Sequence, residues 1–440
     1  DEILNADAGA YVIPVERDLS YAESALTEPW ACVVAAYTQR RRLSPKQGGT
    51  MWIFGQPGDE RDYEFSEFVD APGTIVLSDV PDGVRDLVEK NASQNTKIIE
   101  VNDLNPVDFA SLNADICDGK GFDDIICLSS TSADVVSEAV KLIAFRGTFN
   151  IIADEPLHGD VQIDAGRIHY HYTAYLGNPG PDIAASYGEA RNRCDLKNDG
   201  TLIVVGAGGP MGQMHVQRAI EMNGGPKRII ASDIDEKRLL ELRSITQAIA
   251  EDHNKEIFFF NPTTPGQSFA KFLKNLNEGK LADDVVVCVP SGLLMQSSFD
   301  LLGPDGMFVL FAGVPIGVTI SIDISHIFMN NQQLTGTSGS SLDDQKMVIE
   351  KTVEDQLSPI LSVAAVGGMG AALDGLKAMM SGKYPGKVVI FPQVTDLPLV
   401  GLDKLAERYP EIGRKLGKNN AWTYEAEKAL IEKFWKSENV

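Results

Sequence analysis

A cluster of glycines in the middle of the chain has the spacing of a phosphate-binding loop. The loop comprises Gly206, Gly208, Gly209, Pro210, Met211 and Gly212. A dinucleotide pyrophosphate needs a backbone that approaches it without intervening Cβ atoms, and it needs the N–H groups at a helix N-terminus. The spacing therefore predicts a cofactor site, and the alternative is a glycine-rich turn that only packs a helix close to a strand.

The segments around this loop have the expected order of strand, loop, helix and strand. Residues 201–205 and 228–232 are short apolar runs typical of buried strands, and residues 213–222 have a helical pattern. Asp233 closes the second strand, where a carboxylate accepts hydrogen bonds from the ribose hydroxyls of a dinucleotide. A lone glycine triplet is weak evidence for a cofactor site. The strands, the helix and the acid around it strengthen the prediction.

The same acid bears on the choice of cofactor. The carboxylate of Asp233 would repel the 2′-phosphate of NADP. The basic residues Lys237 and Arg238 follow only after a further pair of acids. The sequence therefore favours NAD, with NADP as the alternative.

Self-comparison of the chain shows a repeat with a nearly constant offset. The matching segments are 74–80 with 228–234, 123–127 with 283–287, 149–153 with 308–312, and 161–164 with 320–323. We infer a tandem duplication of a unit of roughly 150 residues, which is the size of a whole domain.

Within each copy, continuous apolar runs alternate with helical stretches, which is typical of parallel strands covered on both faces. We therefore predict an α/β fold with two tandem doubly wound parallel-sheet (Rossmann) domains and remnants of a catalytic domain. The predicted divisions are a linker and helix at 1–49, a degenerate Rossmann-like domain at 50–195, the NAD-binding domain at 196–345, and a C-terminal helical and return segment at 346–440.

The first copy lacks the phosphate-binding pattern. Gly55 and Gly58 follow its first strand, but residues 59–64 bring a run of acids and no third glycine. Several carboxylates at an anion site would compete with a pyrophosphate. We therefore expect this copy to be structural, although Asp79 keeps the position of the ribose-binding acid.

The net charge and the cysteine content limit the classes of binding partner that we expect for this protein. Lys and Arg number 39 against 62 Asp and Glu, a net charge of −23 that makes nucleic acid and membrane surfaces poor partners. Five widely spaced cysteines give neither a disulfide framework nor a CxxC zinc motif. We expect a cytoplasmic protein with reduced thiols and a small-molecule substrate.

On these and four further segments, the chain resembles the medium-chain dehydrogenase/reductase superfamily in its zinc-type polyol and sugar dehydrogenase branch. The segments are 25–32, 289–291, 313–315 and 382–390. The resemblance implies an NAD-dependent oxidoreductase that moves hydride between nicotinamide and a secondary alcohol or ketone. It also places Glu28 where the branch has a glutamate that coordinates the catalytic zinc or its water. Val289 and Val314 fall where the backbone holds the nicotinamide.

The chain also departs from that branch. Members begin with a catalytic domain that supplies a Cys and a Gly-His-Glu pair as zinc ligands, whereas this chain opens at Asp1 without a Met and shows no such segment before Tyr21. We expect zinc only if such a domain is present. The alternative function is a dinucleotide-binding or scaffold unit without catalysis. His169 and His171, interpreted as neighbours on an exposed strand face, do not replace the ligands.

Two more features lead to structural expectations. The last strands of the two copies, 173–177 and 333–337, are expected to pair edge to edge in one continuous sheet, as an internal pseudo-dimer that covers both edges. Homo-oligomers are compatible with that arrangement. Arg40, Arg41 and Arg42 suit either a substrate phosphate or, more commonly, a solvated helix end.

Overall fold

The computed structural model describes residues 13–15, 19–38 and 40–435. They form two compact units. The first unit is drawn from Asp1–Thr38, Leu196–Phe272 and Gly339–Val440, and the second from Gln39–Asp195 and Leu273–Ser338.

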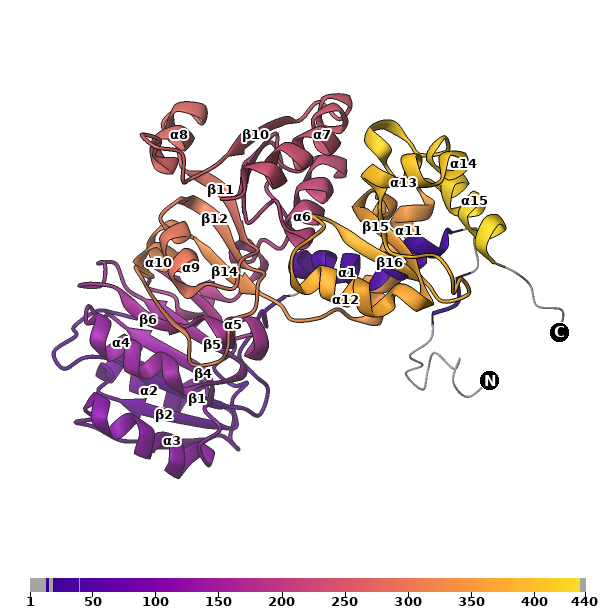
Figure 1. Ribbon diagram of the computed structural model, residues 1–440. Helices are drawn as coiled ribbons and strands as arrows, with labels where there is room; N and C mark the ends of the chain where they lie inside the picture. Colours follow the sequence, from indigo (N-terminus) through magenta and orange to yellow (C-terminus); the bar gives the residue numbers. More distant parts are fainter. Residues whose placement is uncertain (1–12, 16–18, 39, 436–440) are drawn as a thin grey trace. The chain divides into compact units, whose positions relative to one another are not determined.

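Two six-stranded sheets dominate the fold (Figure 1). The first has the order β3-β2-β1-β4-β5-β7, with β1 (Thr50–Phe54), β2 (Thr74–Ser78), β3 (Lys97–Glu100), β4 (Phe122–Leu128), β5 (Ile143–Ile152) and β7 (Ala174–Asn178). The second has the order β10-β9-β8-β11-β12-β14, with β8 (Thr201–Val205), β9 (Arg228–Ser232), β10 (Glu256–Phe260), β11 (Ala282–Val287), β12 (Leu302–Leu310) and β14 (Gln333–Gly336). The predicted α/β fold class is confirmed.

The identical strand order confirms the duplication inferred from sequence. In both sheets the chain first builds three strands outward, then returns past the first strand to add the others. The strand pairs that can be compared run parallel, as in β1 with β4 and β11 with β12. All five residues of β8 are buried, as are the last four of β1. The continuous apolar runs of the sequence are thus strands buried on both faces, because the crossover helices of a parallel sheet pack on both sides of it.

The helices follow the strands in sequence. In the first copy they are α2 (Asp82–Asn91), α3 (Phe109–Cys117), α4 (Ala133–Ala139) and α5 (Ala165–His171). In the second copy they are α6 (Pro210–Glu221), α7 (Glu236–Asp252), α8 (Phe269–Leu276), α9 (Gly292–Phe299) and α10 (Ser325–Asn330). His169 and His171 therefore lie on a helix, and their interpretation as strand neighbours was wrong. The segment is too short and too close to β6 for periodicity to separate strand from helix.

The expected single continuous sheet is not formed. The edge strands β7 and β14 contact each other, yet the two sheets remain separate. The hydrogen-bonded link is instead a two-stranded antiparallel sheet of β6 (Val161–Asp164) and β13 (Thr319–Ile322). Helix α5 contacts β14, and α10 contacts β7. These contacts lie within the second unit. Helix α5 of the first copy contacts the edge strand of the second, α10 of the second copy contacts the edge strand of the first, and β7 and β14 themselves share no backbone ladder.

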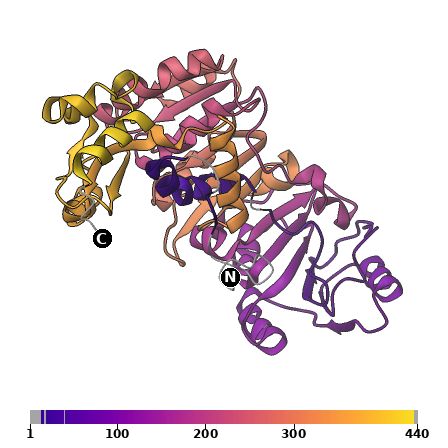
Figure 2. The ribbon, with the colours of Figure 1, turned by 90° about the vertical axis from the view of Figure 1, so that its right-hand side faces the viewer.

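The first unit also contains the N-terminal helix and the C-terminal segment. Helix α1 (Tyr21–Thr38) packs against α11 (Leu342–Val353), as both views of the ribbon show (Figures 1 and 2). A three-stranded sheet has the order β16-β15-β17, from β15 (Val363–Gly368), β16 (Lys387–Phe391) and β17 (Val400–Gly401). Helix α12 (Ala372–Met380) connects β15 to β16, and α13 (Leu402–Arg408), α14 (Pro410–Gly413) and α15 (Tyr424–Phe434) follow β17. The predicted C-terminal helices are present.

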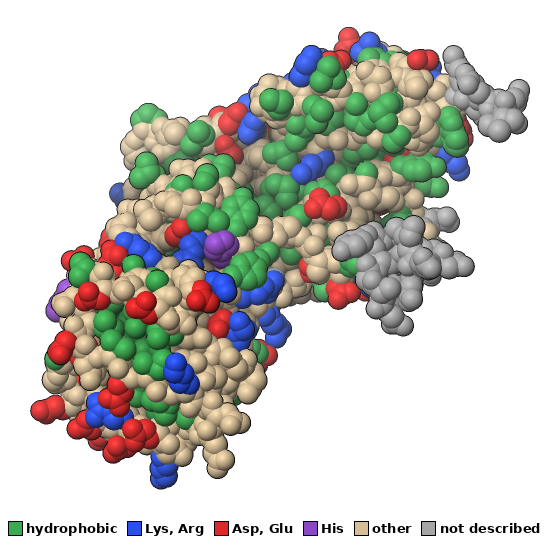
Figure 3. Space-filling view, turned by 90° about the horizontal axis from the view of Figure 1, so that it is seen from below, with side chains coloured by type: hydrophobic (Ala, Val, Ile, Leu, Met, Phe, Trp, Pro, Cys, Tyr) green, Lys and Arg blue, Asp and Glu red, His purple; other side chains and the backbone are tan. Residues whose placement is uncertain are grey.

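Hydrophobic side chains are visible on the molecular surface (Figure 3). On α12, Leu373, Leu376 and Met380 are exposed. Among the described residues, no helix combines the length and the apolar character that crossing a membrane requires.

Candidate functional site

The glycine loop adopts a conformation that depends on its glycines. Gly206 has a φ of +79°, in the left-handed region that favours glycine. Its N–H donates to the carbonyl oxygen of Ser232, 2.8 Å away, which joins the ends of β8 and β9. A Cβ at Gly212 would overlap the carbonyl oxygen of Gly206. The loop and the helix therefore approach each other as closely as a pyrophosphate-binding turn requires.

Helix α6 begins at Pro210, three residues before the predicted start at Gln213. Proline at this first position loses no hydrogen bond, because its missing N–H would be unpaired in any helix. Gly209 is the N-cap, and no side chain caps the helix there. The first turn thus presents backbone N–H groups and the positive end of the helix dipole beside the loop. A Cβ on Gly209 would meet only the Gly206 carbonyl oxygen, at 3.5 Å.

Asp233 accepts hydrogen bonds from the glycine loop as well as from its own turn. Its Oδ2 accepts a hydrogen bond from the N–H of Gly208 at 2.9 Å, and its Oδ1 accepts one from the N–H of Asp235 at 3.0 Å. The half-buried carboxylate is thereby fixed next to the glycines, with lone pairs left for a sugar hydroxyl. The structure brings together the loop and Asp233, as the sequence predicted.

Arg238, which the sequence analysis discounted because two acids precede it, also lies beside this acid. Its Cβ would be 2.6 Å from a Cβ built on Gly208, and its guanidinium donates to the carbonyl oxygen of Gly382. A cation next to the ribose end weakens the argument against a 2′-phosphate that spacing alone suggested.

Lys387 is a second residue that sequence reasoning did not single out. Its Nζ lies 3.1 Å from Sδ of Met211, in the first turn of α6. Burial lowers the pKa of Lys387, while Glu28 and Cys32 favour its charged form. Lysine at the start of a strand carries no signal by itself, although the stretch 382–390 had been noted for its resemblance.

Glu28 lies on α1 and is exposed. It accepts a hydrogen bond from Sγ of Cys32 at 3.2 Å, one helical turn away. Burial, followed by this bond, raises the pKa of the Cys32 thiol to about 11. Glu28 interacts electrostatically with Lys387, and both residues belong to the same unit as the loop.

The described residues do not fit a zinc ion. Glu28 and Cys32 offer two donors, whereas a catalytic zinc site needs three protein ligands. No group of three or more His, Cys, Asp and Glu side chains within the described part of the chain is arranged to hold a metal. No step of the chemistry is therefore assigned to zinc.

Val289 and Val314 lie in the second unit. Val289 is half-buried just after β11, and Val314 is buried after β12. Because β11 and β12 are adjacent and parallel, both residues lie at the same edge of the sheet. The N–H of Ala312 donates to the carbonyl oxygen of Val287 and joins the two strand ends.

In the first copy, the corresponding edge is built differently. No helix is present between β1 and β2, where residues 55–73 form an irregular loop. Arg61 of this loop pairs with Asp154 at 3.1 Å and donates to Ser129 and to the carbonyl oxygen of Pro179. These partners follow β4, β5 and β7, so the arginine side chain spans the carboxyl edge of the sheet.

The fold and the loop define a class of protein: an α/β protein with one glycine loop of the dinucleotide-binding kind. Residues 210–354 match the model of the zinc-binding dehydrogenase family. This match and the curated relatives described below support the resemblance, seen in the sequence, to the medium-chain dehydrogenase/reductase superfamily in its zinc-type polyol and sugar dehydrogenase branch.

Two curated relatives are sugar-phosphate enzymes by name. Mannitol-1-phosphate 5-dehydrogenase of Aliivibrio fischeri is 32% identical over 247 residues, which cover 54% of this chain and 57% of the relative. L-sorbose 1-phosphate reductase of Klebsiella pneumoniae is 25% identical over 251 residues, covering 54% and 56%. The chain thus spans little more than half the length of these relatives.

Solved structures are more distantly similar. An alcohol dehydrogenase zinc-binding domain protein from Burkholderia ambifaria is 15% identical, with a TM-score of 0.36, and the match covers 44% of this chain and 49% of that one.

Proposed function

We propose that this chain supplies the cofactor-binding portion of an NAD-dependent oxidoreductase of the zinc-type alcohol, polyol or sugar-phosphate dehydrogenase kind. The reaction would be hydride transfer between nicotinamide and a secondary alcohol or ketone. The observation that carries the proposal is the hydrogen bond between Gly208 and Asp233, which fixes a carboxylate beside an uncapped helix N-terminus.

Different residues of the chain would bind different parts of the dinucleotide. The backbone of residues 206–212 and the first turn of α6 would take the pyrophosphate, and Lys387 would add a positive charge at that turn. Asp233 would accept hydrogen bonds from the adenosine ribose. Val289 and Val314 would hold the nicotinamide through their backbone. Bound NAD supplies the hydride acceptor, and NADH the donor.

A sugar or polyol phosphate is the proposed substrate class. The proposal draws on the names of the two curated relatives, which act on mannitol 1-phosphate and L-sorbose 1-phosphate. The residues of this chain do not by themselves select a stereochemistry.

The domain divisions at 1–49, 50–195, 196–345 and 346–440 are part of the same proposal. We interpret the two copies as an internal pseudo-dimer, supported by the antiparallel pair β6–β13 and by the contact of β7 with β14.

A fluorescence titration with NADH tests the proposal directly. Gly209→Asp places a carboxylate where the pyrophosphate would lie, at a position whose Cβ has ordinary room. We expect it to abolish binding while circular dichroism shows an intact fold. Gly209→Ala is the matched control and should reduce affinity far less. Undiminished binding by Gly209→Asp would contradict the proposal.

The second candidate function is a dinucleotide-binding or scaffold unit without catalysis. It is favoured by the absence of a three-ligand metal cluster among the described residues. NADH binding without NAD-dependent oxidation of any polyol phosphate, assayed with NAD and zinc, would favour this candidate over the enzyme.

A further inference from the structure

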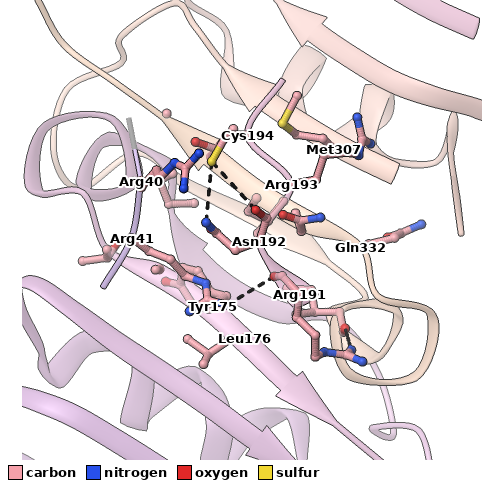
Figure 4. A pocket seen from close by; sticks show the side chains of 18 of the residues that line it. Arg40, Arg41, Tyr175, Leu176, Arg191, Asn192, Arg193, Cys194, Met307 and Gln332 are labelled. Atoms are coloured by element: carbon pink, nitrogen blue, oxygen red, sulfur yellow. Dashed lines mark hydrogen bonds between the residues drawn. The ribbon is translucent and has the colours of Figure 1, made fainter. Parts of the chain in front are cut away.

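A narrow cavity of about 90 Å³ lies in the second unit beside the edge strands β7 and β14 (Figure 4). Six arginines line it: Arg40, Arg41, Arg42, Arg146, Arg191 and Arg193. None of the described residues that line it is an Asp or a Glu. Such a concentration of one charge is unexpected in a chain whose net charge is −23.

Three of these arginines are balanced by carboxylates. Arg42 pairs with buried Asp124 at 3.1 Å, and Arg193 pairs with buried Asp284 at 2.7 Å. Arg40 forms an exposed pair with Glu189. The first two pairs occupy equivalent positions in the two copies, and they account for the structural role of two members of the cluster.

Arg41 and Arg191 donate their hydrogen bonds to backbone carbonyl oxygens, and the charges of Glu189 and Asp305 act on them without a direct ion pair. Arg41 donates to the carbonyl oxygens of Arg42, Ser186 and Arg191. Arg191 donates to the carbonyl oxygens at positions 327 and 328, near the end of α10. A guanidinium has five N–H groups, so both side chains keep donors for another partner.

Arg146 is the third of these arginines that forms no direct ion pair in the described structure. Its guanidinium lies over the ring of Tyr172, 4.6 Å from the centroid. Burial lowers the pKa of Arg41 to about 10, and the charge of Arg191 lowers it further in the same direction. An anion beside Arg41 would offset this repulsion.

We propose that this cavity binds one phosphate-sized oxyanion between Arg41, Arg146 and Arg191. The planar fork of a guanidinium matches the oxygens of a phosphate or sulfate. The volume suits a single tetrahedral ion and is well below the roughly 300 Å³ at which sites for larger ligands begin. The ion would join the two edge strands where they contact without a backbone ladder.

The oxyanion could be inorganic phosphate or the phosphoryl group of a phosphorylated small molecule, since both present the same oxygens. The site is separate from the glycine loop, and it does not depend on the proposed oxidoreductase function.

Isothermal titration calorimetry of the full chain with inorganic phosphate tests this assignment. We expect one site in the wild-type chain, weakened about tenfold or more by Arg41→Gln and by Arg146→Gln, because each removes a charge-assisted contact. Arg146 donates no hydrogen bond within the described structure, so Arg146→Gln should keep the fold. It therefore tests the site even if Arg41→Gln unfolds the chain. Arg243→Gln is the matched control, since Arg243 is also exposed and lies over an aromatic ring, Phe259, at 4.8 Å.

Two further arms locate the ion and its source. Gly209→Asp should leave phosphate binding unchanged, which separates this cavity from the glycine loop. Mannitol 1-phosphate, added in competition, should displace phosphate if the source is an organic ester and should not if it is the free ion; either result keeps the site. No binding, loss in Gly209→Asp, or unchanged binding in Arg146→Gln would overturn the proposal.

Discussion

The carboxyl edges of the two copies differ far more than their sheets. In the second copy, the loop after β8 turns at once into α6, and Asp233 is bonded to the N–H of Gly208. In the first copy, the loop after β1 forms no helix, and Arg61 crosses the edge to Asp154. The same strand order therefore carries a glycine loop and a helix N-terminus in one copy and a bridging side chain in the other.

The acids that close the second strands show the same contrast. Asp233 accepts from a glycine of the loop, whereas Oδ1 of Asp79 accepts from the N–H of Asp103. Asp79 itself has a φ of +51° and turns the chain. An acid at this position is thus a ligand-binding candidate only where the neighbouring loop offers it a glycine N–H.

The two copies are alike at the arginine–aspartate pairs on strands β4 and β11. Arg42 with Asp124 and Arg193 with Asp284 are equivalent pairs with a buried carboxylate, and each arginine also donates to the carbonyl oxygen of the preceding aspartate. The shared pairs occupy equivalent structural positions, whereas the carboxyl edges, where we propose that the cofactor binds, differ between the copies.

The largest effect is expected at Gly212. Gly212→Ala forces a Cβ onto the Gly206 carbonyl oxygen. We expect a loss of about 3 kcal/mol in the free energy of unfolding, together with loss of NADH binding, in urea denaturation and fluorescence titration. Gly83→Ala in α2 of the first copy, where nothing lies within 4 Å of the new Cβ, should change stability by no more than about 1 kcal/mol. Equal effects of the two substitutions would refute the contrast between the copies.

Next in size is the effect of the acid itself. Asp233→Asn keeps the shape and removes the charge. We expect NADH to bind about tenfold more weakly, because charge-assisted hydrogen bonds to the ribose are lost, and NADPH to gain relative to NADH. Asp79→Asn is the control in the first copy and should leave both affinities unchanged. A wild-type chain that binds NADPH more tightly than NADH would show that Arg238 outweighs Asp233.

The smallest effect concerns α6, the helix that the first copy lacks. His215 on this helix is fully buried and lies 2.7 Å from the hydroxyl of Tyr37. Burial, followed by the charge of Arg218, lowers its pKa to about 3. Between pH of roughly 6.5 and 3, the unfolded chain therefore binds one more proton at this residue than the folded chain, and stability falls as the pH falls.

Denaturation of His215→Gln from pH 7 to pH 5 checks this prediction. The wild type should lose up to about 1.4 kcal/mol per pH unit more than the variant below pH of about 6.5. The exposed His253→Gln serves as control and should keep the wild-type slope. Identical slopes for His215→Gln and the wild type would contradict the lowered pKa.

The sequence was sufficient to predict the two repeated sheets, because continuous apolar runs such as 201–205 and 228–232 are typical of strands buried on both faces. It also predicted the loop and Asp233, whose spacing is local in the chain. It discounted Arg238 because two acids precede it, and it did not single out Lys387, whose position beside the loop depends on contacts between distant segments. For the same reason, the edge strands were expected to share a ladder, whereas the structure pairs β6 with β13.

The number of NADH sites per chain tests the central claim most directly. Fluorescence titration of the wild-type chain at protein concentrations above the dissociation constant should saturate at one equivalent, and Gly209→Asp should bind none. Two equivalents, or one that survives Gly209→Asp, would show that the edge crossed by Arg61 binds the dinucleotide after all.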